Sequence, residues 1–214
     1  MKTKYTANKK IIARSETIID QFRDIYDLDS LPIDKQYWSI CASNSNIDST
    51  ILKGGEYDQV LNSGLISSQQ FYGVDIVPNI INNNIVAIPD ANWICGDFYE
   101  TMVEFNGNNR FHPGIVNCDM LVSPKYGSNY VSKILSLLND GNFNDVMFVS
   151  NLILKSYTWE FTEDQLVDML LKQPGIKHAI NSGWKIKNQV YTYWGSFGKR
   201  SKMGSVIFYN KNQK

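Results

Sequence analysis

The chain has 214 residues, 43% of them hydrophobic and 20% charged, which is the composition of an ordinary globular domain. Basic and acidic residues both number 21, so the formal net charge is zero. This balance argues against a dominant electrostatic hold on nucleic acid, although it leaves room for a local basic face. No apolar run reaches the ~20 residues that a membrane span requires.

The first ten residues are basic but lack the apolar stretch of a secretory signal, so we expect a cytoplasmic protein with no membrane partner. Cys41, Cys95 and Cys118 each lie in an apolar, strand-like run, and none belongs to a Cys-x-x-Cys pair. We expect buried, reduced thiols and no metal site. The abundance of Asn, Ile, Lys and Tyr is typical of AT-rich coding, as in viral or low-GC bacterial genomes.

An amphipathic helix is predicted at residues 8–27, where apolar residues such as Ile18 and Phe22 recur at helical spacing. We assign residues 1–35 to an N-terminal helical segment and residues 36–214 to one main α/β domain. That domain begins with a predicted strand at residues 37–42, followed by a polar loop. A short helix is expected at 56–63, and Gly64 is well placed to end it.

Three predicted strands then each end in an aspartate. They cover residues 71–75, 93–97 and 114–119, and a helix opens at Pro78 between the first two. Asp75, Asp97 and Asp119 are each 22 residues apart. Such a span holds one short strand and one crossover connection, as neighbouring parallel strands require.

Helices and strands continue to alternate after these units. The predicted elements are a helix at 130–138, a strand at 145–154, and a helix at 162–172 that Pro174-Gly175 ends. Two β-rich, aromatic segments at 183–194 and 203–209 are expected to form an antiparallel pair. The pattern predicts a three-layer, doubly wound α/β fold with a mostly parallel sheet.

Ligands of such sheets bind outside the carboxyl ends of the strands, where the three aspartates are expected to gather. A carboxylate such as Asp75 can accept two hydrogen bonds from a ribose diol. Asp97 followed by Phe98 suits an adenine, because the acid can accept from the exocyclic amine while the ring packs on the base. Each aspartate could instead simply cap the helix that follows it.

These elements, in this order, resemble the class I S-adenosylmethionine-dependent methyltransferases over roughly residues 36–210. The resemblance implies a seven-stranded sheet whose last strand lies antiparallel between the fifth and sixth. It also implies S-adenosylmethionine as the cofactor. The residues implied to contact the cofactor follow the first four strands: Ala42, Ser43 and Asn44, then Asp75 and Ile76, then Asp97 and Phe98, and finally Asp119. The resemblance also implies that Asp119 is the catalytic residue, beside the transferred methyl.

The first loop of the family is usually glycine-rich, whereas no glycine follows the strand at 37–42 before Gly54. A second motif, the Asp/Asn-Pro-Pro-aromatic of base-directed enzymes, has a loose counterpart in Ser123-Pro-Lys-Tyr126. Alternatively, Asn117-Cys-Asp119 is the functional end of the fourth strand, and we favour Asp119 because of the 22-residue spacing.

Ser123, Lys125 and Tyr126 are therefore the expected substrate-binding residues, in a loop at 123–129 that walls the acceptor pocket together with the N-terminal helix. Two hypotheses follow. The first is an active methyltransferase whose acceptor is an unidentified small molecule or nucleic acid. The second is a catalytically silent methyltransferase-like fold that serves as a binding or assembly module, and the glycine-poor loop favours it.

Overall fold

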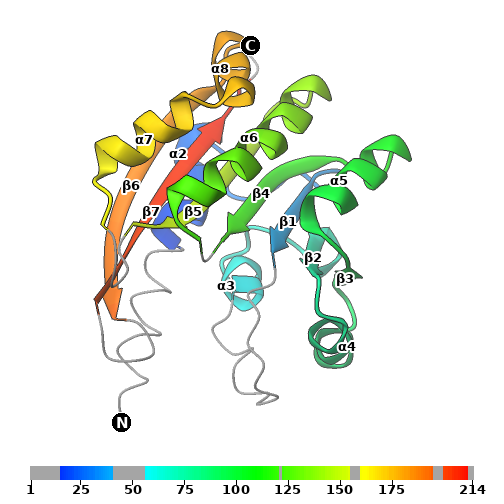
Figure 1. Cartoon of the computed structure of the whole chain (residues 1–214). Coiled ribbons are helices and arrows are strands. Elements are labelled where there is room, and N and C mark those ends of the chain that lie inside the picture. The colour runs from blue at the N-terminus through cyan, green and yellow to red at the C-terminus, as the bar shows by residue number, and fades with distance from the viewer. Residues whose placement is uncertain (1–14, 41–55, 121, 155–159, 195–199, 212–214) are drawn as a thin grey trace.

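The computed structural model describes residues 15–40, 56–120, 122–154, 160–194 and 200–211. Its centre is a seven-stranded mixed sheet with the strand order β3-β2-β1-β4-β5-β7-β6 (Figure 1). The strands are β1 (Gln36–Ile40), β2 (Phe71–Asp75), β3 (Asn92–Cys95), β4 (Pro113–Asp119), β5 (Met147–Ile153), β6 (Lys185–Trp194) and β7 (Arg200–Tyr209).

Strands β1 to β5 pair parallel with one another, and β7 pairs antiparallel with both β5 and β6. The predicted C-terminal pair is therefore part of the main sheet, with β7 inserted between the fifth and sixth strands. The chain leaves the β3 edge and returns on the other side of β1 to form β4. The strand order thus reverses between β1 and β4, the place where ligands of open α/β sheets bind.

Helices cover both faces of the sheet (Figure 1). One face carries α5 (Phe98–Gly107), α6 (Pro124–Asp140), α7 (Glu163–Leu171) and α8 (Pro174–Asn181). The other carries the π-helical turn η1 (Ser15–Asp20), α2 (Gln21–Tyr26) and α3 (Glu56–Asn62). Helix α4 (Pro78–Ala87) packs beside β2 and β3, and the 3₁₀ turn η2 (Ser68–Gln70) leads into β2.

Two hydrophobic cores follow from this layering. Trp38, Val116 and Phe148 face α5 to α8 and are fully buried. Their sequence neighbours Tyr37 and Ile115 face α2 and are buried as well. Because both faces are covered, the strands read as nearly continuous apolar runs instead of alternating ones.

Two helix predictions needed correction. Helix α6 begins at Pro124, six residues before the predicted start, because Pro124 takes the first helical position after Ser123. The Pro174-Gly175 pair does end α7, but Pro174 also opens α8, which was not predicted. The expectation of a buried Cys95 was also wrong, since this thiol is exposed at the end of the edge strand β3, whereas Cys118 is buried.

Candidate functional site at the carboxyl edge of the sheet

The carboxyl ends of the parallel strands meet at one edge of the sheet, to which the arrowheads of β1 and β4 point in Figure 1. Asp75 is the last residue of β2, and Asp119 is the last residue of β4. Asp97 follows β3 by two residues. Only β1 separates β2 from β4, so the ends of these two strands lie about 10 Å apart, twice the spacing of paired strands.

The carboxylate of Asp75 shapes the turn after β2. Its side chain is 7% exposed, and Oδ1 accepts the Val77 N–H at 2.9 Å. A carboxylate has two oxygens and about four acceptor positions, so this contact leaves capacity for further donors. The next residue, Ile76, is 72% exposed and places an apolar side chain at the same edge.

Asp97 caps the N-terminus of α5. Its Oδ1 accepts the Glu100 N–H at 3.0 Å, and its carbonyl oxygen accepts the Thr101 hydroxyl at 2.6 Å. The helix-capping alternative is therefore confirmed for this residue, while its side chain stays exposed at the edge. Phe98 is 3% exposed and its ring belongs to the core, in contrast to the expectation of a ring stacked on a base. The exposed apolar surface beside Asp97 comes instead from Ile76.

Tyr130 of α6 joins this group of residues, although sequence analysis did not select it. Its hydroxyl lies 3.4 and 3.5 Å from the two carboxylate oxygens of Asp97 and accepts the Tyr99 N–H at 3.0 Å. Burial is the main cause that raises the pKa of the Tyr130 hydroxyl, and the charge of Asp97 adds to it. Only the packing of α6 against α5 brings these residues together, so no local sequence signal marks Tyr130.

Asp119 ends β4 next to the fully buried thiol of Cys118. The pKa of this thiol is raised first by burial and then by the charges of Asp119 and Asp97. Asp119 is partly buried and pairs in register with Asn151 of β5. The Asn151 side chain is 5% exposed and donates to Asn117 Oδ1 at 3.3 Å.

This buried amide pair extends into β7, because Ser205 Oγ donates to Asn151 Oδ1. Asn117 had been singled out in the sequence as part of the Asn117-Cys-Asp119 alternative, but Asn151 and Ser205 had not. The sequence signal that could have identified Asn151 and Ser205 is their position as polar residues inside apolar strand runs. Most buried polar groups in proteins have hydrogen-bond partners, and the bonded cluster of Asn117, Asn151 and Ser205 beside Asp119 follows this rule.

The expected substrate-binding residues lie at the start of α6 and not in a loop. Ser123 is the N-cap residue and is 5% exposed, whereas Lys125 and Tyr126 lie in the first turn and are exposed. The Lys125 ammonium is 5.7 Å from the centre of the Tyr126 ring. Helix α2, the described part of the second expected wall, packs on the opposite face of the sheet. Ala42, Ser43 and Asn44 lie outside the described residues.

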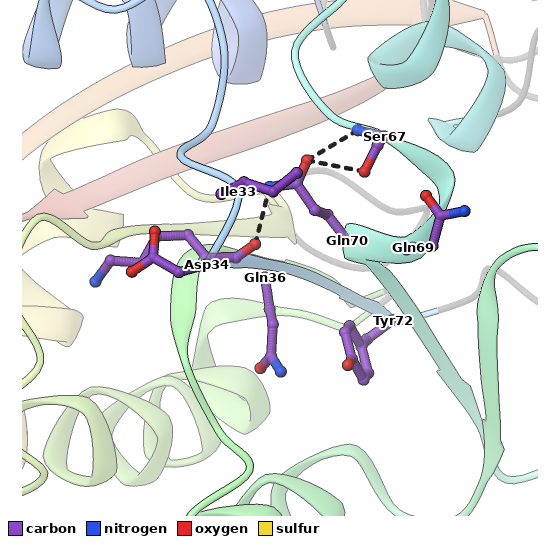
Figure 2. Close-up of a pocket in the computed structure, with 8 residues that line it drawn as sticks. Ile33, Asp34, Gln36, Ser67, Gln69, Gln70 and Tyr72 are labelled. Atoms are coloured by element: carbon purple, nitrogen blue, oxygen red, sulfur yellow. Dashed lines mark hydrogen bonds between the residues drawn. The ribbon is translucent and has the colours of Figure 1, made fainter.

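A pocket of about 330 Å³ lies at the opposite, amino edge of β1 and β2 (Figure 2). Its buried glutamines have structural partners. Gln70 donates from Nε2 to the carbonyls of Pro32 and Lys35 and accepts the Ser67 N–H. Gln36 accepts from the Trp38 indole and donates to a carbonyl. These contacts tie together the loops that enter β1 and β2, so we assign this pocket no part in the candidate site.

Among the residues that the structure describes, no group of three or more His, Cys, Asp or Glu side chains is arranged to hold a metal ion. None of the helices in the same part of the chain is both long enough and apolar enough to span a bilayer.

Several solved structures of methyltransferases match this architecture. The plantazolicin methyltransferase BamL, in complex with a triazolic desmethylPZN analog and SAH, matches with a TM-score of 0.56 at 11% identity, over 97% of this chain and 87% of that chain. The fold is that of the class I methyltransferases. The N-methyltransferase NodS from Bradyrhizobium japonicum WM9 matches with a TM-score of 0.51 at 7% identity, over 99% of this chain and 100% of NodS.

The methyltransferase domain of the bacterial CtHen1 C-terminal part also matches, with a TM-score of 0.51 at 12% identity, over 93% of this chain and 97% of that chain. No family model matches the sequence, and no curated protein matches it either. Methyltransferases of this fold therefore share its arrangement of strands and helices, while the sequence has diverged from theirs.

Proposed function

We propose that this protein binds S-adenosylmethionine at the carboxyl edge of the sheet and transfers its methyl group to a small molecule or to a short nucleic-acid segment. One observation carries the proposal. A sheet of methyltransferase order, with β7 between β5 and β6, brings Asp75, Asp97 and Asp119 to a single edge.

The residues at this edge suit the cofactor. Asp75 would accept hydrogen bonds from the ribose diol through the capacity that the Val77 N–H leaves unused. The exposed side chain of Ile76 would pack against the adenine, and the exposed carboxylate of Asp97 would accept from its amine. Residues 42–44 would contact the methionine part, as the resemblance to the family implies.

The cofactor supplies an electrophilic methyl group on a sulfonium centre. The protein's own contribution would be alignment, which alone can lower a barrier by several kcal/mol. Asp119, at the end of β4, would orient the acceptor and take up its proton. Its charge lies beside the Asn117–Asn151 amide pair, and this pair would fix the floor of the site beneath the acceptor.

A small acceptor fits the charge of the chain better than a long nucleic acid does. With a formal net charge of zero, the chain has no overall positive charge to attract a long phosphate backbone. Ser123, Lys125 and Tyr126 would form the rim of the acceptor site, and Lys125 and Tyr126 offer a cation and a stacking surface. BamL, which shares the fold, has SAH and a substrate analogue bound in its structure.

Cofactor binding is tested by calorimetry with S-adenosylmethionine and S-adenosylhomocysteine. Asp75→Ala should weaken binding by about 1.5–3 kcal/mol, because charge-assisted hydrogen bonds to the ribose are lost. Asp90→Asn, an exposed carboxylate in the turn before β3, is the matched control and should bind normally. Wild-type affinity in Asp75→Ala would remove the ribose assignment.

Methyl transfer is tested with radiolabelled cofactor against DNA, RNA, protein lysate and a pool of small metabolites. Transfer to one pool that disappears in Asp119→Asn, with cofactor affinity retained, supports the catalytic assignment. Unchanged transfer in that variant would exclude Asp119 from catalysis. Undetectable binding of both cofactor forms at millimolar concentration would favour the silent fold acting as a binding or assembly module.

A further inference from the structure

The hydroxyl of Tyr130 connects two helices at the candidate cofactor site. It lies 3.4 Å from Oδ1 and 3.5 Å from Oδ2 of Asp97, and it accepts the Tyr99 N–H at 3.0 Å. A phenol has one donor hydrogen and can accept as well. The Tyr99 N–H occupies an acceptor position of the hydroxyl, and the single hydrogen of Tyr130 is available to the carboxylate of Asp97.

This contact does more than cap a helix. The N-terminus of α5 is already capped by Asp97 Oδ1, which accepts the Glu100 N–H at 3.0 Å, while the Thr101 hydroxyl donates to the main-chain carbonyl of Asp97. The capping contact comes from within α5 and involves only one oxygen of the carboxylate. The Tyr130 hydroxyl, from α6, lies at similar distances from both oxygens and is therefore placed to orient the carboxylate plane from a second helix.

The Tyr130 ring is itself held in place. It is half-buried and packs edge-on against Tyr99, with ring centres 6.4 Å apart. Burial raises the pKa of the hydroxyl above its ordinary value, so Tyr130 remains a donor throughout the neutral range. A fixed donor of this kind can orient an exposed acceptor, and such contacts often shorten only when the ligand is bound.

We propose that Tyr130 is a positioning residue that orients the Asp97 carboxylate for recognition of the exocyclic amine of adenine. The proposal rests on the proposed function. It assigns the discrimination between adenine and a 6-oxo purine to a pair of side chains from two different helices. A carboxylate held in this orientation accepts from an amine and repels a carbonyl oxygen at the same position of the base.

The test compares the affinities of S-adenosylhomocysteine and S-inosylhomocysteine, measured by calorimetry. The two ligands differ in the group at the purine 6-position and in the proton that the 6-oxo purine carries on the adjacent N1. Wild-type protein should prefer the adenine compound by about tenfold or more. Tyr130→Phe should reduce that preference by about fivefold, which corresponds to the loss of one hydrogen bond that orients Asp97.

Two further variants isolate the effect. Tyr26→Phe removes a hydroxyl that donates to the Asn210 carbonyl at 3.0 Å. Tyr26 lies at the amino edge of the sheet, far from Asp97, so this variant should leave the preference for the adenine compound unchanged. Asp97→Asn should lower the preference, and adding Tyr130→Phe to it should lower it no further, because the two residues act as one unit.

The outcomes separate the two proposals. Wild-type protein that binds neither ligand overturns the proposed function, and the role of Tyr130 with it. If the adenine compound binds but Tyr130→Phe keeps the wild-type preference, the role of Tyr130 alone is overturned. Equal weakening of both ligands, with a lower melting temperature, would reduce Tyr130 to a structural contact between α5 and α6.

Discussion

Tyr26 is a buried phenol at the amino edge of the sheet, and it makes the stability of the fold sensitive to alkaline pH. Its hydroxyl is bonded to the Asn210 carbonyl, and burial, together with the nearby Asp145 carboxylate, raises its pKa above the ordinary value of 10.0. The unfolded chain therefore loses this proton at a lower pH than the folded protein does. The stabilisation is complete below pH 10 and is lost as the pH rises above it.

We expect the free energy of unfolding to fall above pH 10, with a smaller slope in Tyr26→Phe. One such group contributes at most about 1.4 kcal/mol per pH unit. Urea unfolding of both proteins between pH 8 and 11.5 measures the two slopes. Below pH 9 the slopes should be equal, which serves as the internal control. Equal slopes above pH 10 would show that Tyr26 ionises alike in the folded and unfolded states.

Helices α6 and α8 meet so closely that glycine is required at their contact. A Cβ atom on Gly175 would lie 2.6 Å from the Ser132 carbonyl oxygen of α6, and the Gly175 N–H already donates to Ser132 Oγ at 3.1 Å. Gly175→Ala should therefore destabilise the protein by roughly 1–3 kcal/mol, because α8 must move away from α6. Thermal or urea unfolding measures this loss.

Gly107 provides the matched control for this substitution. It is the last residue of α5, and a Cβ there would meet no atom within 4 Å. Gly107→Ala should be neutral or should stabilise by up to about 1 kcal/mol, because alanine has the higher helix propensity. A Gly175→Ala variant as stable as Gly107→Ala would mean that the contact between α6 and α8 adjusts at little cost.

The existence and order of most described elements could be predicted from local pattern, whereas some boundaries could not. Strand β2 and helix α3 occur where the pattern of apolar residues and turn residues predicted them. Gly64, with a positive φ of 72°, follows the end of α3 as expected. Proline accounts for the errors. Pro124 was expected in a loop, and Pro174 was expected only to end a helix. Each instead occupies the first position of a helix, where its missing N–H costs nothing.

The placement of the candidate residues at one edge was predictable only where it follows from strand order. Asp75, Asp97 and Asp119 were found because parallel strands end at one edge of a sheet. Tyr130 was missed because its contact with Asp97 depends on how α5 and α6 pack. The buried orientation of Phe98 was missed for a similar reason, since its neighbours in the core come from distant strands and helices.

Seen as a whole, the molecule depends on its C-terminal strands for a closed core. Val206, Ile207 and Phe208 of β7 are buried, and Phe208 stacks on Phe148 of β5 with ring centres 5.8 Å apart. A chain truncated after Gly183 would lose two strands and leave the hydrogen-bonding edge of β5 unpaired. We expect it to aggregate or to lack a cooperative melting transition, as calorimetry and circular dichroism would reveal.

Phe208→Ala provides a graded version of this experiment. It should remain folded but lose about 3–5 kcal/mol, the cost of removing a buried aromatic ring. A soluble truncated chain with a cooperative transition would contradict the central role of β7. Wild-type stability in Phe208→Ala would contradict it independently.

The insertion of β7 between β5 and β6 also determines the order in which the sheet can be completed during synthesis. Residue 147 of β5 pairs with residue 209 of β7, so β5 is translated long before its partner. Until then the nascent chain presents a row of unpaired peptide groups along β5, and β6 has no neighbour to join. An open strand edge of this kind recruits strands from other chains. We therefore expect newly made molecules of this protein to need shielding by the ribosome or by chaperones until residue 209 is available to pair, a need that a sheet assembled in chain order would not have.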